Sequence, residues 1–311
     1  MRRRNVFDTD ALRLLDAVAA TGSFTAAAAR LNYTQSAVSR RIAALETQAG
    51  GPLFDRLARG VRLTPAGQAL HHHARVVLNR LARAEEELAG IHGGHRGTLR
   101  VGAFATANVA LVPGALRAFA DRFPDVALTP VEGPSGGLLR RMREGELDVA
   151  VVSDYPAGLP YDEDVELTGL VEEELLVALP RGHRLAGLEV VDLRELREET
   201  WIEAPPPGGT TLLAQACARA GFAPRATVRI AEWTGKFGYV AAGLGVTLVP
   251  ALAAPAVPAG LVLRSLGGSA PRRTVSTALP RTPLPAARAL VGLLTETVET
   301  VGRQPHASAG Q

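Results

Sequence analysis

Cysteine is nearly absent from this sequence of 311 residues. The single cysteine, Cys217, excludes an internal disulfide framework and is typical of a protein that works in a reducing compartment. It lies in an apolar helical stretch with Leu213 and Ala216, so we predict a buried thiol that serves packing. A redox function is the less favoured alternative.

Uncharged stretches long enough to cross a membrane are also scarce. Residues 239–263 carry no charge, but Pro250, Pro255 and Pro258 interrupt them and would leave backbone groups unsatisfied in lipid. A buried helix end, a buried strand and a loop explain this segment better. The basic start Met1-Arg2-Arg3-Arg4 is followed by no apolar run, so we expect no secretory signal, no membrane contact and a cytoplasmic protein.

Catalytic signatures are missing as well. The sequence has no glycine-rich dinucleotide fingerprint after a strand, no phosphate-binding loop, no HExxH zinc motif and no GxSxG nucleophile elbow. The consecutive histidines His71, His72 and His73 would point about 100° apart on a helix and cannot converge on one metal, so we predict solvated helix surface. We therefore expect that the protein is not an enzyme and that it has no cofactor and no metal site.

The mild net charge of +3 conceals an uneven distribution. Residues 1–66 hold ten arginines and five acidic residues, an excess of five positive charges. The rest of the chain holds 24 basic and 26 acidic residues, an excess of two negative charges. A basic excess confined to the N-terminal fifth is expected if that part alone meets phosphate, although any small basic domain would show it too.

Hydrophobic periodicity divides the chain into three parts, which we predict as domains over residues 1–65, 66–93 and 97–311. The first is dense in short helical patterns, and the second has apolar residues at three- and four-residue steps, typical of one long helix. In the third, apolar strands alternate with helices, which predicts a parallel α/β architecture in two lobes. The predicted strands are residues 99–104, 126–132, 147–152, 174–179, 201–203, 227–230, 246–249 and 274–278.

A helix-turn-helix is predicted near the N-terminus. Ser23 can cap a helix over residues 24–31, and Thr34 can cap a second helix over residues 35–46, with Asn32-Tyr33 as the turn. On a helical wheel of the second helix, one face is apolar and inward, formed by Val38, Ile42 and Leu45. The opposite face is small and polar except for one arginine, and it contains Ser36, Arg40 and Ala43, with Ser39 at its edge.

That polar face has the chemistry of a DNA-reading helix. Small side chains let a helix backbone sink into a major groove, while an arginine can contact guanine or clamp a phosphate, and serine hydroxyls can bond to either. We therefore assign DNA binding to Gln35, Ser36, Ser39 and Arg40. An ordinary amphipathic surface helix is the alternative, and the tight helix-turn-helix spacing argues against it.

A basic loop follows the second helix. Arg56, Arg59 and Arg62 cluster around Gly60, which suits phosphate contacts beside the groove or a probe of the minor groove. Any one of them would also fit a solvated loop.

The apolar stripe of the next, long helix has no domain beside it in sequence to cover it, so we predict a dimer through this helix. Packing onto its own domains is the alternative.

Four stretches together resemble the LysR-type transcriptional regulator family. They are GSFTAAA at 22–28, QSAVSRRIAALE at 35–46, PLFDR at 52–56 and RLTPAG at 62–67, in one order between residues 22 and 67. The α/β remainder is similar to that family's effector domain in GTLRVG at 97–102, GELDVA at 145–150 and VAAGLGV at 240–246. A match of this length is far more specific than a lone motif.

The resemblance implies an architecture and a set of partners. We expect an N-terminal winged helix-turn-helix, a dimerising linker helix and a two-lobed α/β effector domain like periplasmic binding proteins. The expected partners are a double-stranded DNA operator, a small-molecule effector, further copies of the chain up to a tetramer, and RNA polymerase. A cytoplasmic small-molecule-binding protein with only architectural DNA contact is the alternative function.

Effector contacts are expected in the crevice at the carboxyl ends of the strands. The first strand is followed by Thr106 and Asn108, which suit an anion, and the resemblance places further contacts at Gly133 and after Glu203, at Pro205, Pro206 and Thr210. The run of three prolines at 205–207 departs from the family pattern and removes three amide donors. The only lysine, Lys236, and Trp233 either face this cleft or are a surface lysine and a packed tryptophan.

Overall fold

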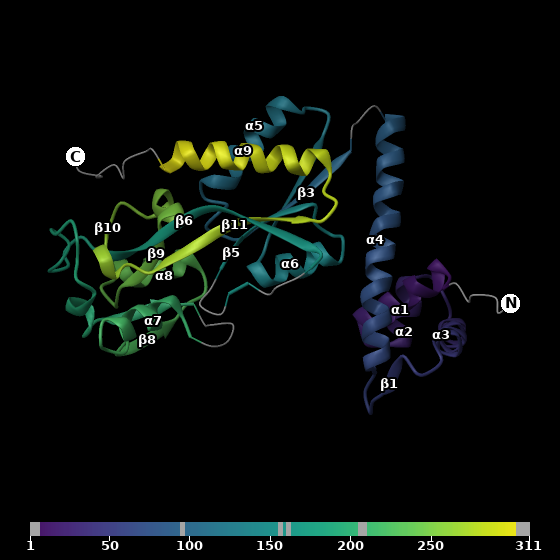
Figure 1. Ribbon diagram of the computed structural model, residues 1–311. Coiled ribbons are helices and arrows are strands. Elements are labelled where there is room, and N and C mark those ends of the chain that lie inside the picture. The colour runs from purple at the N-terminus through teal and green to yellow at the C-terminus, as the bar shows by residue number, and fades with distance from the viewer. Residues whose placement is uncertain (1–6, 94–96, 155–157, 160–162, 205–209, 303–311) are drawn as a thin grey trace. The chain divides into compact units, whose positions relative to one another are not determined.

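The computed structural model describes residues 7–93, 97–154, 158–159, 163–204 and 210–302 (Figure 1). The chain divides into two compact units, one formed by residues 1–98 with the short segment 143–146 and one formed by the rest. Each unit has hydrophobic clusters of its own.

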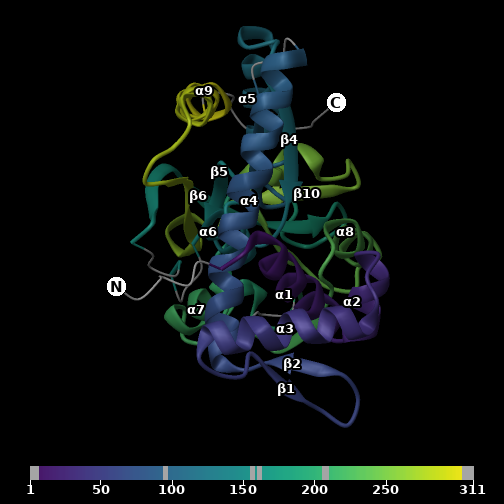
Figure 2. The same cartoon turned by 90° about the vertical axis from the view of Figure 1, so that its right-hand side faces the viewer.

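The N-terminal unit contains three short helices, a β-hairpin and one long helix. Figure 2 shows the short helices gathered around one end of the long helix, with the hairpin projecting beyond α3. The elements are α1 (Thr9–Thr21), α2 (Phe24–Arg30), α3 (Gln35–Ala49), β1 (Phe54–Arg56), β2 (Val61–Leu63) and α4 (Pro65–Gly93).

Local chemistry fixes where α2 and α3 begin and end. The hydroxyl of Ser23 accepts from the amide of Ala26 and that of Thr34 from the amide of Ala37, each at 3.3 Å, so both predicted caps are confirmed. In the turn between the helices Asn32 adopts φ 56°, a left-handed conformation that asparagine tolerates. Helix α3 runs three residues past its predicted end and stops where Gly50 takes φ 81°.

The core of the N-terminal unit is built on the inward face predicted for α3. Val38, Ile42 and Leu45 are each at most 2% exposed, which confirms that face. They belong to one cluster with Leu12, Leu15, Val18, Ala27, Ala28, Leu53, Phe54 and Ala74.

Helix α4 shares its apolar stripe between this core and the solvent. Ala74 is buried in the cluster, and Leu70 and Leu78 pack against it, so this part of the stripe packs onto its own domain, which was the alternative to the predicted dimer contact. Val77, Leu81 and Leu88 are 43%, 38% and 56% exposed, respectively, and form the uncovered part of the stripe.

The C-terminal unit contains a seven-stranded mixed sheet and a separate two-stranded parallel sheet. Its strands are β3 (Thr98–Ala103), β4 (Ala127–Glu132), β5 (Val149–Ser153), β6 (Val165–Pro180), β7 (Thr200–Glu203), β8 (Ala226–Arg229), β9 (Thr247–Pro250), β10 (Leu261–Arg264) and β11 (Arg272–Pro280). Its α-helices are α5 (Leu111–Arg122), α6 (Ser135–Arg143), α7 (Leu212–Arg219), α8 (Trp233–Ala241) and α9 (Pro285–Gly302).

Strand β6 organises the large sheet, whose order is β10-β6-β11-β5-β3-β4. Residues 165–174 of β6 pair with β11, while residues 175–180 pair with β9 and β10. The sheet thus forms one lobe around β3, β4 and β5 and a second lobe around β9 and β10, to which β7 connects by a bridge between Trp201 and Val246. The predicted parallel pairing holds for β3 with β5 and for β7 with β8, whereas β6 pairs with β9, β10 and β11 in antiparallel fashion.

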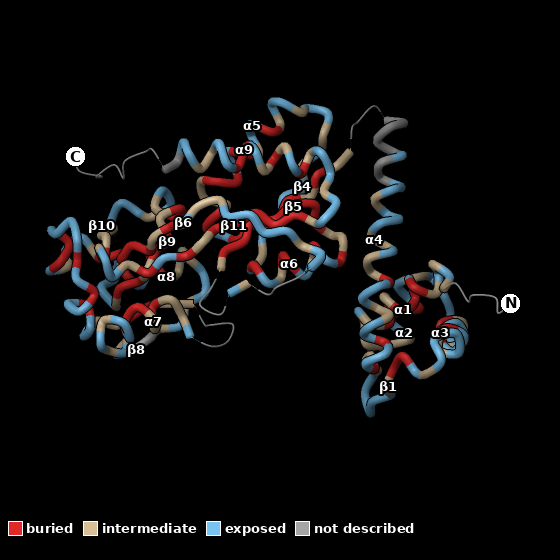
Figure 3. The backbone as a smooth tube through the Cα atoms, in the orientation of Figure 1, coloured by how far each residue is buried: buried red, intermediate tan, exposed pale blue. Residues whose placement is uncertain are grey.

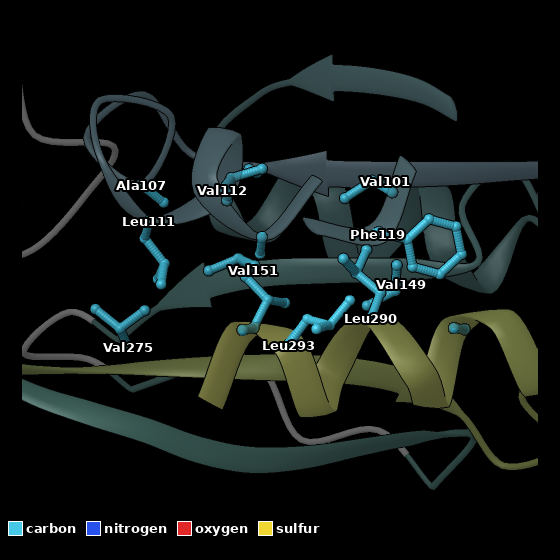
Figure 4. Packing of buried hydrophobic residues seen from close by; sticks show 14 of the residues in the cluster. Val101, Ala107, Leu111, Val112, Phe119, Val149, Val151, Val275, Leu290 and Leu293 are labelled. Atoms are coloured by element: carbon cyan, nitrogen blue, oxygen red, sulfur yellow. The ribbon is translucent and has the colours of Figure 1, made fainter. Parts of the chain in front are cut away.

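Helices cover both faces of the first lobe. In Figure 1, α5 and α9 lie on one side of the sheet and α6 on the other. Figure 4 shows Phe119 of α5 and Leu290 and Leu293 of α9 converging on Val149 and Val151 of β5. Figure 3 shows the result, a buried sheet interior under helices whose outer sides are exposed.

The beginning of β6 and all of β10 were missed by the sequence patterns. Residues 165–170 of β6 are mostly exposed, and they lack the continuous apolar run that marked residues 174–179 as a strand. Strand β10 begins in the uncharged segment that was expected to end in a loop. None of the helices in the described part of the chain combines the length and apolar character needed to cross a bilayer.

Thr64 connects the hairpin to the start of α4. Its buried hydroxyl donates to the carbonyl of Pro52 at 2.8 Å and accepts from the amide of Gly67 at 3.0 Å. Pro65 then takes the first helical position, where a missing amide hydrogen costs nothing.

Replacing Thr64 by valine should destabilise the N-terminal unit by about 1–3 kcal/mol, because both partners lose their hydrogen bond in a buried place. Hydrogen exchange of the α3 core amides in the full-length chain measures this opening free energy. Thr47→Val is the matched control, since the Thr47 hydroxyl bonds to the Ala43 carbonyl on an exposed surface. An equal effect of the two substitutions would contradict the explanation.

Candidate nucleic-acid interface and ligand-binding residues

The outward face of α3 is open to solvent. Gln35, Ser36 and Arg40 are exposed and Ser39 is half-buried. The side chain of Arg40 makes no hydrogen bond or ion pair with any residue that the structure describes, so its guanidinium is available to a ligand. The face combines one free cation with small polar neighbours, as the sequence predicted.

The neighbouring arginine is held by the protein itself. The guanidinium of Arg41 lies 5.1 Å from the ring centroid of Tyr33 and 4.0 Å from a carboxylate oxygen of Asp10. The two adjacent arginines on α3 therefore differ in whether they are free to bind a ligand. Of the two, only Arg40 has a side chain without a partner among the described residues.

Glu46 ties the end of α3 to the hairpin, a role that the sequence patterns did not reveal. Its carboxylate accepts from the amides of Leu53 and Phe54 at 2.8 and 3.3 Å. The hairpin turn itself depends on Gly60, which has φ 85° and whose Cβ, if present, would lie 2.6 Å from the carbonyl oxygen of Gly22. The hairpin is thus fixed against both α1 and α3.

Three arginines of the hairpin are exposed. Arg56 and Arg59 form no ion pair with any described residue, whereas Arg62 pairs with Asp55 at 3.3 Å across the two strands. Two free cations of the hairpin therefore accompany Arg40, and the charge of Arg62 is partly compensated.

His71 departs from the expectation of solvated surface. Its ring nitrogen Nε2 lies 2.9 Å from a carboxylate oxygen of Asp16, which joins α4 to α1. This hydrogen bond, together with the charges of His71, Arg75 and Arg30, lowers the pKa of the Asp16 carboxyl against an opposing effect of burial. The pair lines a pocket of about 430 Å³ within the N-terminal unit. His72 and His73 are exposed as predicted.

The residues expected to bind an effector are partly brought together. Asn108 donates to the Glu132 carboxylate at 3.2 Å, and the amide of Gly133 donates to the carbonyl of Ala103 at 3.1 Å, so both lie at the carboxyl ends of β3 and β4. Thr210 is exposed before α7. Pro205 and Pro206 lie outside the described residues.

Thr106 is only 3% exposed, and its hydroxyl is engaged by the protein. It accepts from Nη2 of Arg273 at 2.7 Å. Arg273 in turn forms a buried ion pair with Glu173, with Nε 2.7 Å from Oε1. The second oxygen of Glu173 accepts from the amide of Leu252 at 2.9 Å, and the guanidinium lies 4.9 Å from the ring centroid of Phe104.

This network connects the two lobes. Thr106 and Phe104 follow β3 in the first lobe, while Leu252 follows β9 in the second. Glu173 and Arg273 are register partners on β6 and β11, at the place where β6 changes partners. No sequence signal marked this pair, because its members lie 100 residues apart.

Cys217 is fully buried, as predicted. Burial, with a smaller contribution from the charge of Glu203, raises the pKa of its thiol to about 11. The thiol is therefore protonated at neutral pH, which leaves little of the reactive thiolate. Among the described residues, no group of three or more histidine, cysteine or acidic side chains is placed to hold a metal ion.

A winged helix-turn-helix joined to a two-lobed α/β domain defines a class of ligand-responsive DNA-binding proteins. Residues 9–68 match the model of the bacterial regulatory helix-turn-helix of the LysR family, and residues 92–299 match that of the LysR substrate binding domain. The chain belongs to the LysR family of DNA-binding transcriptional regulators.

Relatives and solved structures agree with this assignment. The chain is 36% identical to the transcriptional regulator ShiR of Corynebacterium glutamicum over 75% of its own length and 79% of ShiR. It is 34% identical to the regulator BudR of Raoultella terrigena over 77% of its length and 83% of BudR. Full-length CbnR complexed with its target DNA has the same fold, with a TM-score of 0.71 at 23% identity over 94% of this chain and 100% of CbnR.

Removing only one member of the buried Arg273–Glu173 pair should strongly destabilise the C-terminal unit. Glu173→Gln leaves a buried guanidinium without its counter-charge, which should cost about 3–5 kcal/mol of unfolding free energy. Denaturant unfolding followed by Trp201 fluorescence measures the loss. The double variant Glu173→Met with Arg273→Met removes both charges and should recover most of it, because no unpaired charge remains. A double variant as unstable as Glu173→Gln would refute this view of the pair.

Proposed function

We propose that this LysR-family regulator reads a specific operator as a symmetric dimer, with α3 of each copy in a major groove. Residues 1–65 would bind DNA, residues 66–93 would dimerise, and residues 97–311 would bind a small-molecule effector. The main support is that Arg40 presents a free cation on an exposed helix face of small polar residues. A free guanidinium on such a face can reach the edge of a guanine.

The surroundings of Arg40 support a reading role for α3. Gln35, Ser36 and Ser39 offer short hydrogen-bonding groups that allow close approach to the bases. The start of α3 carries the positive end of the helix dipole, which favours a nearby phosphate. Free Arg56 and Arg59 of the hairpin, with Arg62 beside them, suit sequence-independent contacts to the DNA backbone.

The uncovered stripe of α4 supports assembly of two copies. Val77, Leu81 and Leu88 expose large apolar side chains along the helix, and the same stripe of a second copy would cover them. Such a dimer would place its two α3 helices about 34–36 Å apart on a pseudo-palindromic operator. A tetramer formed from two dimers is the larger assembly that we propose.

The effector would bind between the lobes of the C-terminal unit. Asn108, Gly133 and Thr210 are proposed to contact it, together with Pro205 and Pro206, while Thr106 would act through Arg273. Closure of the lobes on the ligand would favour one arrangement of the assembly over another, and this shift would change DNA bending or the contact with RNA polymerase.

Arg40→Ala should weaken binding to an operator selected by the wild-type protein by about 1–3 kcal/mol and relax the preference at one base position. Fluorescence anisotropy at fixed salt measures both effects. Arg41→Ala is the matched control, since it removes the same charge from a side chain that already stacks on Tyr33. An unchanged base preference in Arg40→Ala, or an equal loss in both variants, would rule out base recognition by Arg40 and favour an architectural contact.

Leu81→Asp should shift the protein toward monomers, because a buried carboxylate without a partner opposes dimerisation. Sedimentation velocity measures the shift. His72→Asp is the control, because His72 is exposed. It precedes Leu81 by nine residues, about two and a half helical turns, and therefore lies on the opposite side of α4. A Leu81→Asp protein that sediments as the wild type would remove the α4 stripe from the interface.

A further inference from the structure

Lys236 is the only lysine in the chain, and it is 6% exposed. The other cations of this protein are arginines, and most of those in the described residues are exposed. Lysine keeps a compact, strongly hydrated charge that is costly to remove from water without a counter-charge. A single lysine in a buried position therefore requires a specific explanation.

The ammonium of Lys236 lacks an ionic partner among the described residues. Its Nζ lies 4.1 Å from the ring centroid of Trp233, which supplies a cation–π contact. Glu203, whose charge acts on it, already pairs with Arg229 at 2.6 Å. Glu232 is exposed and also acts only at a distance. Burial lowers the pKa of Lys236, and these two carboxylates oppose the shift without cancelling it.

The place of Lys236 in the fold is where α/β proteins bind ligands. It lies in the first turns of α8, which packs against β6, β7 and β10. Glu203 is the last residue of β7 and is the register partner of Arg229 on the parallel strand β8. Ligands of open α/β sheets bind beyond the carboxyl ends of such strands.

The start of α8 adds a second feature that favours an anion. The capping residue Glu232 makes no side-chain hydrogen bond to the helix, so its carboxylate does not satisfy the first amides of α8. Those amides and the helix dipole favour a negative group near the helix start. A buried cation and an uncapped helix start thus lie within one turn of each other.

We propose that Lys236 anchors the effector of this regulator and that the effector is a small organic acid whose carboxylate pairs with the ammonium. The proposal rests on the proposed effector-binding function and names the class of ligand. The carboxylate would supply the missing counter-charge, while Trp233 holds the ammonium in place. Glu203 and Glu232 already add negative charge nearby, which favours a carboxylate over the more highly charged phosphate.

The uniqueness of Lys236 allows a direct test. Full-length protein grown with lysine labelled with carbon-13 at Cε gives one lysine resonance, which reports the protonation and surroundings of this amine alone. Sodium acetate, benzoate and succinate are the probes, with acetamide, benzamide and succinamide as neutral counterparts and inorganic phosphate as the competing anion. At least one carboxylate should move the resonance saturably and raise the pKa of the amine, whereas its amide should not.

Substitutions of Lys236 test whether the amine contributes to the affinity for the bound acid. Calorimetry with the bound acid should show about tenfold or greater weakening in Lys236→Met, because one partner of a buried charge pair is lost. Lys236→Arg should retain part of the affinity. Arg225→Met is the control, since it removes one positive charge from an exposed pair with Glu198 in the same unit and should leave the affinity unchanged.

The outcomes separate this proposal from the proposed function. If no carboxylate moves the resonance at millimolar concentration, or if the amides or phosphate move it as strongly, the assignment of Lys236 to an organic acid is overturned. Operator binding by the same protein preparation is measured in parallel. Selective operator binding with an unresponsive lysine overturns only the present proposal, whereas a responsive lysine without selective operator binding overturns the proposed function alone.

Discussion

Arg273 and Glu173 form an ion pair that is almost wholly removed from water, where the long strand β6 passes from one lobe of the C-terminal unit to the other. Such a pair is tolerated only if its geometry is good and the remaining polar atoms are satisfied. Thr106 in the first lobe and the Leu252 amide in the second provide that satisfaction. The arrangement of the lobes therefore depends on this buried network, because its hydrogen bonds join atoms of both lobes.

The N-terminal unit is subject to a different constraint. It holds α3 in place through the inward face of the helix and leaves the outward polar face free. Three apolar residues of α3 fill the core, and Glu46 and Thr64 fasten the hairpin through its backbone. None of these contacts uses the outward face of α3. A rigid support beneath an unoccupied polar face is the condition for precise positioning of contact groups on DNA.

Availability, rather than number, distinguishes the cations of this protein. Arg41 and Arg62 are exposed but have partners within the chain, whereas Arg40, Arg56 and Arg59 have none among the described residues. Lys236 is buried, and its ammonium contacts the ring of Trp233 but has no ion-pair partner among the described residues. Arg41 and Arg62 contribute to the protein's own surface, whereas the other cations have the charge available that binding of DNA or of an anionic ligand would require. Net charge alone would not separate them.

The sequence by itself determined the helix-turn-helix, its caps at Ser23 and Thr34, and the division of α3 into an apolar and a polar face. These features depend on spacings of three or four residues, so local periodicity is enough to predict them. It did not determine the partners of Arg273, the burial of Lys236 or the contact of His71 with Asp16. It also did not determine which part of the apolar stripe of α4 packs into the N-terminal core. Each of these depends on which distant surfaces meet, and no local pattern encodes a contact between residues 100 positions apart. The tertiary structure alone decided them, because burial and counter-charge are properties of the assembled surfaces.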